Sequence, residues 1–309
     1  MRRSLAAVCS AAVLVACAGC SAAGAGRSAS TALRPAAGSG TASAGSSGGQ
    51  LKPPTVAGLA WHPEGTVVRG QRATYVAVTG QGSVALMWMN PAVLTFRFIP
   101  GFKYPEHGPI RPADRLPSTW TPRMAAAFNG AFKLLDNVGG YYYAGVTVKP
   151  LQAGLASLVV DARGHLSVVQ WGRERRSVVG VALVRQNMSL LVDQYTARTS
   201  VHDTNSTWGW ADHDTRLANR SALGQLTDGS LVYVYGHDVT AQDMAAALVG
   251  VHARTGIMLD MNLSQPGGFV YWRQAGQVTG QRILPSIYHP PTVYLHPDAK
   301  DFLVAMTRP

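Results

Sequence analysis

Short apolar runs separated by glycine-rich turns make up most of the chain after residue 53. The runs 74–78 and 83–89 flank a Gly-Gln-Gly turn, and the runs 155–160 and 166–171 flank an Asp-Ala-Arg-Gly turn. This spacing is typical of antiparallel hairpins, and further strands are predicted over 93–99, 178–184 and 190–192. The pattern therefore predicts an α+β fold with a mixed, largely antiparallel sheet core and few helices.

The clearest helical pattern lies between residues 240 and 251. Thr240 and Asp243 have the spacing of a capping box, which marks a helix start. Met244 and Leu248 lie on one apolar face of the predicted helix. We expect the helix to end at Gly256, a residue type favoured at helix C-termini. Before it, strands over 221–226 and 230–235 form a hairpin around the turn 227–229.

Two apolar strands each run into polar residues. The run 257–259 precedes Asp260 and Asn262, and the run 123–128 precedes Asn129 and Gly130. A carboxylate at the mouth of a buried strand is partly desolvated, which raises its pKa and suits it to catalysis. The alternative is that Asp260 caps a turn or accepts backbone N–H bonds. The shared layout predicts that Asn129 and Asp260 lie at the same rim of one central sheet.

These segments resemble those of the phosphodiester glycosidase family, over roughly residues 124–272. The resemblance rests on Phe-Asn-Gly-Ala-Phe at 128–132, on the hairpin segments 220–224 and 228–229, and on the pair Leu259-Asp260. The family usually continues that pair with three glycines, whereas Met261 and Asn262 follow here. A bacterial branch with the pattern Leu-Asp-x-Asn is more similar. The resemblance implies a phosphodiester-glycosidase-like fold and the hydrolysis of a sugar-1-phosphodiester bond.

The resemblance also implies roles for particular side chains. Asp260 is expected to be the catalytic carboxylate, acting on the oxocarbenium-like anomeric carbon or on water. Arg220 is expected to anchor the phosphate, or alternatively to pair with Asp260 in the core. Tyr142 belongs to a Gly-Gly-Tyr-Tyr-Tyr run that suits sugar recognition or an ordinary strand. The full set of substrate-binding candidates is Asn129, Gly130, Arg220, Asn262, Lys133, Asp136 and Tyr142.

Other chemistries are less well supported by the sequence. A divalent metal site would draw on His202, Asp203, His213 and Asp214, but this spacing matches no familiar ligand pattern. We therefore expect no metal and no other cofactor. The net charge of +11 favours anionic surface polymers or lipid headgroups as partners. The sequence contains no nucleic-acid-binding motif, so nucleic acid is not an expected partner.

The N-terminal region predicts export. A basic start and an apolar run over 5–16 have the dimensions of a signal peptide. Cys17 follows Leu-Val-Ala as in a lipobox, Cys20 is a second candidate for lipidation, and a plain secretory signal is the alternative. All 3 cysteines of the chain lie in this region, so the folded domain contains no disulfide. Residues 21–52 are rich in Ala, Gly and Ser, a composition that cannot form a core.

We therefore divide the chain into a lipoprotein-type signal peptide (1–20), a disordered tether (21–52) and a phosphodiester glycosidase-like domain (53–309). The predicted protein is an exported glycosidase, held by lipid on the outer face of the bacterial membrane. Its predicted substrates are surface glycans or glycolipids that contain a phosphodiester-linked sugar. The alternative is a non-catalytic relative that binds cell-wall polymers or other glycans.

Overall fold

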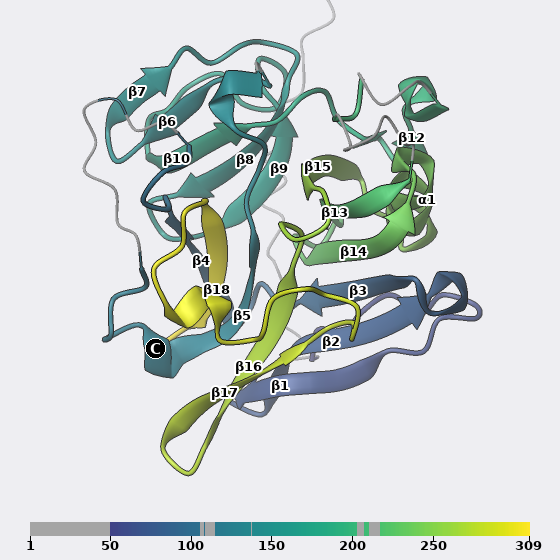
Figure 1. Cartoon of the computed structure of the whole chain (residues 1–309), viewed down its shortest axis with the longest axis vertical. Helices are drawn as coiled ribbons and strands as arrows, with labels where there is room; N and C mark the ends of the chain where they lie inside the picture. The colour runs from purple at the N-terminus through teal and green to yellow at the C-terminus, as the bar shows by residue number, and fades with distance from the viewer. Residues whose placement is uncertain (1–49, 106–107, 109–114, 137, 203–206, 210–216) are drawn as a thin grey trace, which may run out of the picture. The chain divides into compact units, whose positions relative to one another are not determined.

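Figure 1 presents a computed structural model of the chain, which describes residues 50–105, 108, 115–136, 138–202, 207–209 and 217–309. The chain divides into two units, Met1–Gly48 and Gly49–Pro309, and the following description concerns the second unit. The predicted signal peptide with Cys17 and Cys20 lies outside the described residues, as do Asp203, His213 and Asp214.

Three sheets organise the fold (Figure 1). The first has, in spatial order, β1 (His62–Val68), β2 (Gln71–Thr79), β3 (Val84–Met89), β14 (Leu231–Val239), β13 (Ala218–Gln225), β15 (Thr255–Met261), β11 (Val192–Asp193) and β12 (Thr196–Ala197). The second has β7 (Val146–Lys149), β6 (Tyr141–Tyr143), β10 (Val181–Gln186), β8 (Ala156–Asp161) and β9 (Leu166–Gln170). The third has β17 (Gln277–Arg282), β16 (Gly268–Gln274), β5 (Met124–Asn129), β18 (Phe302–Thr307) and β4 (Leu94–Ile99).

The predicted α+β class is wrong, because the fold is β-rich. The described residues form 18 strands and one α-helix, α1 (Ala241–Gly250), and every strand ladder among them is antiparallel. Antiparallel strands are joined by tight turns and need no helical crossover. The remaining helical segments are single 3-10 turns: η1 (Gly80–Gly82), η2 (Thr121–Arg123), η3 (Leu134–Asp136), η4 (Thr199–His202) and η6 (Val293–Leu295).

The predicted capping box begins α1. The Thr240 hydroxyl accepts from the Asp243 backbone N–H, and the Asp243 carboxylate accepts from the Thr240 N–H at 2.8 Å. The predicted helix end is wrong, because α1 stops at Gly250 and Gly256 lies within β15. A Cβ on Gly256 would lie 2.7 Å from the side chain of Leu248. The glycine is therefore explained by close packing between α1 and the sheet.

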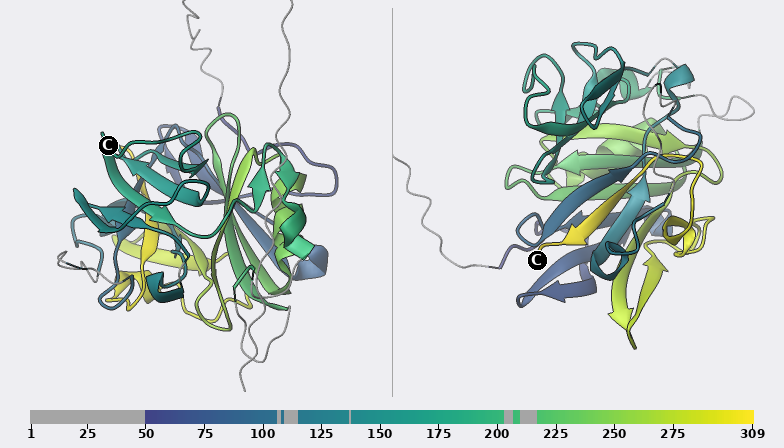
Figure 2. Two further views of the ribbon diagram at one scale, coloured as in Figure 1. Left: turned by 90° about the horizontal axis from the view of Figure 1, so that it is seen from above. Right: turned by 90° about the vertical axis from the view of Figure 1, so that its left-hand side faces the viewer.

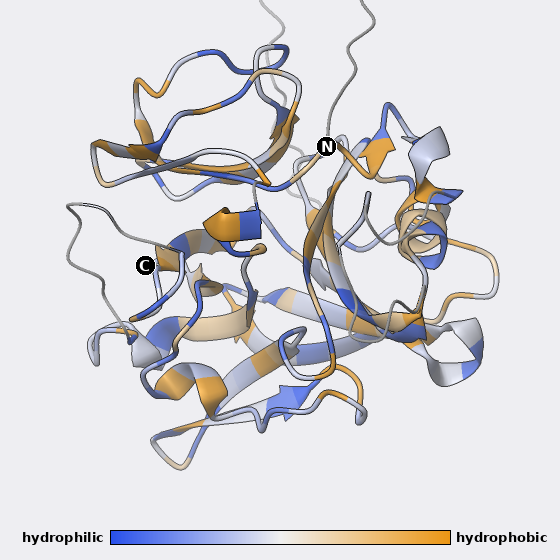
Figure 3. Cartoon of the chain, turned by 45° about the horizontal axis from the view of Figure 1, so that its top comes forward, coloured by the Kyte–Doolittle hydropathy of each residue, from blue (hydrophilic) through white to orange (hydrophobic). Residues whose placement is uncertain are grey.

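A large apolar core joins the three sheets. Phe128 of β5 packs on Tyr233 of β14 with ring centroids 5.0 Å apart, which links the third sheet to the first. Hydrophobic and hydrophilic residues are interleaved along the ribbon (Figure 3), but the central strands β3, β5 and β15 are buried along their whole length, so both faces of these strands are covered. Among the described residues, no helix has the length and hydrophobicity required to span a membrane.

The strand β18 lies inside the third sheet, between β5 and β4, and pairs with both (Figure 2). Its partners come from the first half of the chain, whereas β18 itself is formed by residues 302–307. The segment that leads into β18 is thereby brought against the end of β5. This arrangement creates the pocket described next.

Candidate functional site

A pocket of about 350 Å³ opens where β5, β15 and the segment preceding β18 meet. Two predicted site segments contribute to it, although they are far apart in the sequence. We call it the Asp260 pocket. Its lining comprises Phe102, Asn129, Gly130, Asp260, Gln265, His289, Val293, Tyr294, Pro297, Asp298, Ala299, Lys300 and Asp301.

A β-bulge directs Asp260 into this pocket. In the pairing of β13 with β15, Arg220 lies opposite Met261 and Ala222 opposite Met258, so two residues of β15 face Ser221 alone. Met258 and Met261 consequently pack into the same core cluster, on the α1 side of the sheet. The extra residue breaks the alternation and places the Asp260 side chain on the opposite side. Bulges commonly re-aim a side chain in this way beside functional sites.

Asp260 is almost fully buried, with 4% of its surface exposed, and forms an ion pair with Lys300. The Met261 N–H donates to the second carboxylate oxygen, Oδ1, at 2.8 Å. Burial raises the pKa of the Asp260 carboxyl, and the neighbouring charge of Asp301 raises it further, while Lys300 and the Met261 N–H oppose the rise. The carboxylate is thus poorly hydrated but directly contacts a cation.

Asp301 is a second buried carboxylate of the pocket. Its Oδ2 atom accepts from Arg185 Nε at 3.0 Å, in an ion pair whose side chains are 0% and 1% exposed. Burial raises the pKa of Asp301, and Arg185 and Lys300 oppose that rise. A Cβ on Gly130 would lie 2.5 Å from Asp301 Cγ, so only glycine fits at that position. The pocket therefore contains two buried carboxylates, each next to its own cation.

Asn129 holds the pocket wall together rather than pointing a free amide into it. Its amide nitrogen donates to the Gly130 carbonyl and to the Ser221 hydroxyl, at 2.9 and 2.8 Å. Its amide oxygen accepts from the Tyr233 hydroxyl and the Gly267 N–H, at 2.8 and 3.1 Å. An amide side chain offers two donors and two acceptor positions, so its capacity is used within the protein.

Asn129 and Asp260 line one pocket, but the prediction that they share one sheet is wrong. Asn129 ends β5 of the third sheet, whereas Asp260 lies in β15 of the first. The two sheets meet at this point, where the Asp260 N–H donates to the Gly130 carbonyl oxygen at 3.1 Å. The rim is therefore a junction between sheets.

Asn262 and Arg220 lie beside the pocket without lining it. The backbone of Asn262 has φ 125°, a conformation that favours glycine, and its side chain accepts from the N–H groups of Ser264 and Gln265 at 3.1 Å. Asn262 thereby shapes the turn that presents Gln265. Arg220 is buried on the α1 side, donates to the Val239 and Trp208 carbonyl oxygens at 3.1 and 2.8 Å, and has its pKa lowered by burial to about 10.

The other candidates are placed elsewhere. Lys133 lies over the Tyr104 ring, 4.7 Å from its centroid, and Asp136 is exposed in η3. Tyr142 belongs to β6 of the second sheet and packs beside a small apolar cluster. His202 contacts Gln242 at 3.1 Å. Within the described ranges, no three His, Cys, Asp or Glu residues gather in a way that would hold a metal ion.

Sequence reasoning missed Lys300, Asp301 and Arg185. The segment Asp298-Ala299-Lys300-Asp301 immediately precedes the apolar run 302–306, which repeats the layout of an apolar strand beside charged residues seen at Asp260. Arg185 stands at the end of another apolar strand, β10, where burial of a lone arginine would have signalled a missing carboxylate partner.

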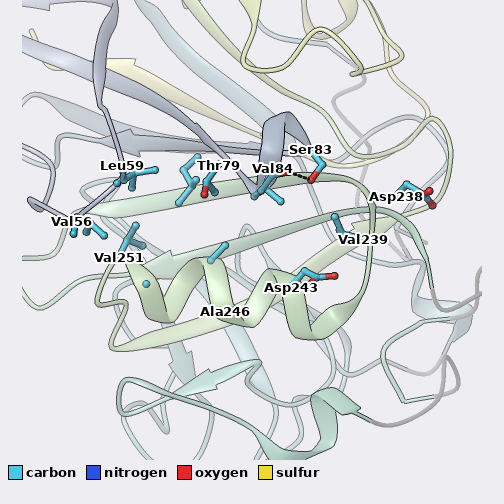
Figure 4. A pocket seen from close by; sticks show the side chains of 16 residues that line it. Val56, Leu59, Thr79, Ser83, Val84, Asp238, Val239, Asp243, Ala246 and Val251 are labelled. Carbon is cyan, nitrogen blue, oxygen red and sulfur yellow. Dashed lines mark hydrogen bonds between the residues drawn. The ribbon is translucent and has the colours of Figure 1, made fainter.

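A larger cavity of about 460 Å³ lies between α1, the β2–β3 turn and residues 56–59 (Figure 4). Its walls are largely apolar, with Val56, Leu59 and Val251 among them. Of its two carboxylates, that of Asp243 is already used in the cap of α1. The buried carboxylates described above, Asp260 and Asp301, lie in the smaller Asp260 pocket instead.

Comparison with known proteins gives only weak similarities. No protein-family model matches the chain, and no curated protein matches it. Among solved structures, the catalytic domain of zebrafish N-acetylglucosamine-1-phosphodiester alpha-N-acetylglucosaminidase, auto-inhibited by its pro-peptide, has a TM-score of 0.45 and 13% identity, over 81% of this chain and 82% of that one. A hypothetical protein from Synechocystis has a TM-score of 0.40 and 12% identity, over 80% and 64%. A Burkholderia pseudomallei protein thought to be exported has a TM-score of 0.34 and 11% identity, over 76% and 75%.

Proposed function

We propose that the chain is an exported glycosidase that hydrolyses the bond between the anomeric carbon of a sugar and a phosphodiester oxygen. The observation that carries the proposal is the buried carboxylate of Asp260, in contact with Lys300 inside a pocket. Segments 128–132 and 259–260, on which the family resemblance rests, both contribute residues to that pocket. The Lys300 ammonium group could bind the single negative charge of a phosphodiester, and the buried Asp260 carboxylate, whose pKa is raised, could act on the sugar.

In the proposed reaction, the bond between the anomeric carbon and the phosphate oxygen breaks, and the phosphate leaves with the bonding electrons as a monoester. Asp260 faces the positive charge that develops on the sugar. It either bonds to the anomeric carbon, in an ester that water then cleaves to release the sugar, or takes a proton from the attacking water. The two routes give opposite anomers of the product. A phosphate monoester is a good leaving group, so protonation of the leaving oxygen is not required.

Lys300 replaces Arg220 as the phosphate-binding cation in this proposal. Lys300 lines the pocket, whereas the Arg220 guanidinium is bound to backbone carbonyls on the other side of the sheet. An incoming phosphodiester would compete with Asp260 for the Lys300 ammonium group. If the phosphodiester replaced Asp260 as the partner of Lys300, Asp260 would be free to act on the sugar, and the charge of Lys300 would stay neutralised.

The test is hydrolysis of the 1-(methyl phosphate) diesters of glucose, mannose, galactose and N-acetylglucosamine by the full chain, measured as released sugar. We expect turnover of at least one diester and a loss of at least about 100-fold in kcat for Asp260→Asn, since a neutral amide cannot stabilise the sugar cation. Lys300→Met should mainly raise KM. Glu174→Gln is the matched control with unchanged turnover, because the Glu174 carboxylate lies in the β9–β10 loop, bonded to Arg173 and the Gln170 N–H and outside the Asp260 pocket.

Thermal melting of the same variants separates chemistry from folding. Lost turnover with an unchanged melting temperature supports a catalytic Asp260. Residual turnover together with a large drop in melting temperature would mean that Asp260 is structural. No hydrolysis of any diester by the wild-type chain would refute the proposed reaction.

One observation favours a second candidate function, a non-catalytic glycan-binding protein. Asp260 is already paired with Lys300, and Asp301 with Arg185, so neither buried carboxylate of the pocket needs a substrate to neutralise its charge. Binding of the same diesters without turnover, abolished by Lys300→Met, would support this candidate.

Export and membrane attachment are part of the proposal. They are supported by the apolar run 5–16 and the lipobox-like residues before Cys17. Mass spectrometry of the native protein should find a lipid-modified N-terminal cysteine, at Cys17 or Cys20. An unmodified N-terminus would leave a plain secreted enzyme.

A further inference from the structure

A separate cavity of about 300 Å³ lies at the seam between the second and third sheets. It is built by β4, the approach to η2, the β6–β7 turn, the β8–β9 hairpin and β10. None of its residues belongs to the Asp260 pocket. Its lining comprises Arg97, Phe98, Trp120, Tyr143, Ala144, Val160, Asp161, Ala162, Ala182 and Leu183.

Aromatic rings form a wall of this cavity. Phe98 is buried and packs on Tyr143 with ring centroids 5.4 Å apart, which fixes the tyrosine. Tyr143 and Trp120 are half-buried, so each ring presents part of its surface to the cavity. In the part of the chain that the structure describes, the Tyr143 hydroxyl has no hydrogen-bond partner. The wall therefore combines apolar ring surface with an available hydroxyl.

Two charged side chains of opposite sign complete the lining. Arg97 lies over Trp120, 5.9 Å from the ring centroid, and its guanidinium donates to the Phe96 carbonyl oxygen at 2.9 Å. Asp161 accepts from the backbone N–H groups of Arg163 and His165 and from His165 Nδ1, at 2.8, 2.9 and 3.0 Å. The carboxylate keeps an acceptor position on Oδ2, and the guanidinium keeps donors to offer.

We propose that this cavity binds one neutral pyranose ring of a glycan, at a site distinct from the Asp260 pocket. The apolar C–H face of a pyranose matches the aromatic wall, because such rings combine a large apolar surface with a polar edge. Its hydroxyl groups would accept from Arg97 and donate to Asp161, which suits a ligand without net charge. The volume lies at the small end of ligand sites, as expected for a single ring.

The test is saturation-transfer NMR and isothermal titration of the full chain with the methyl pyranosides of glucose, mannose, galactose and N-acetylglucosamine. We expect at least one pyranoside to bind and to receive saturation at its C–H face. Trp120→Ala and Arg97→Gln should each weaken binding by about tenfold. Trp272→Ala is the matched control, because Trp272 is also half-buried but lies in β16 outside this cavity.

Two further measurements keep the inference open to refutation. Tyr143→Phe removes only the hydroxyl, so it should weaken binding even if Trp120→Ala fails to fold. Asp260→Asn should leave pyranoside binding unchanged, which separates this site from the proposed catalytic pocket. The inference is overturned if no pyranoside binds, or if Trp272→Ala weakens binding as much as Trp120→Ala. It is also overturned if benzoate displaces the pyranoside while Tyr143→Phe has no effect, because the cavity would then select a flat aromatic ring instead of a sugar.

Discussion

The buried pair of Arg185 and Asp301 allows a sharp prediction about stability. Replacing Arg185 by Met keeps an extended side chain but leaves the Asp301 carboxylate buried without its cation. It also removes the donors to the Gln186 and Phe132 carbonyl oxygens. Breaking one partner of a buried pair costs about 3–5 kcal/mol. For a domain of this size, that corresponds to a drop in Tm of roughly 6–20 °C at neutral pH.

The loss should depend on pH, and the sign follows from the proton balance. Burial already raises the pKa of Asp301, and without Arg185 that pKa rises further. Between about pH 4 and this raised pKa, Asp301 in the native Arg185→Met protein binds a proton that the unfolded chain lacks. Its stability therefore falls as pH rises through this window and recovers as pH is lowered.

The assay is thermal unfolding, followed by circular dichroism, of wild-type and Arg185→Met protein at pH 7.5 and pH 4.5. The difference in Tm between the two proteins should shrink at pH 4.5. Arg185→Met/Asp301→Asn is the control: it removes both charges of this pair, so its difference from wild type should lack this recovery on acidification. An equal loss for Arg185→Met at both pH values, or a drop of less than about 2 °C at pH 7.5, would refute the electrostatic reasoning.

Three further predictions concern single positions. Gly130→Ala should cost about 1–3 kcal/mol in urea unfolding, because its Cβ would overlap Asp301, and a smaller change would contradict the tight packing. Thr240→Ala should cost about 1 kcal/mol through loss of the cap of α1, which an unchanged urea midpoint would disprove. Asn262→Ala should destabilise more than Asn262→Gly, since only glycine tolerates φ 125° without strain, and the reverse order would argue against backbone strain.

The local features of the fold follow from the sequence. The hairpin predicted over 221–235 forms as β13 and β14, Asp260 lies one residue before the end of β15, and the predicted capping box begins α1. These features depend on neighbours within about ten residues, so periodicity and turn chemistry are sufficient to predict them. The predicted helix end is wrong because Gly256 is a glycine that packs within a strand, and the sequence alone does not distinguish it from a C-cap glycine.

The remaining parts of the site depend on contacts between sheets. Lys300 meets Asp260 only because β18 is inserted beside β5, and no local pattern indicates that insertion. The bulge in β15 is equally invisible, since strict alternation would have placed Asp260 on the α1 side. Asn129 and Asp260 lie at the ends of buried strands, as predicted. An apolar run followed by a polar residue has the same sequence pattern whether the two strands belong to one sheet or to two sheets that meet, so the junction could not be predicted.

The insertion of β18 between β5 and β4 also affects how the protein folds. Without residues 302–307, β5 is an edge strand and β4 has no strand partner among the described residues; unpaired backbone groups of this kind favour association with other chains. Closing a sheet through contacts so distant in sequence is slow, because the loop entropy is lost before the pairing is gained. The same step carries Lys300 and Asp301 to Asp260, so a chain that has not completed its third sheet has no assembled pocket. Under the proposed function, activity should therefore require the insertion of β18, and an intermediate that lacks this insertion would be both inactive and prone to aggregate.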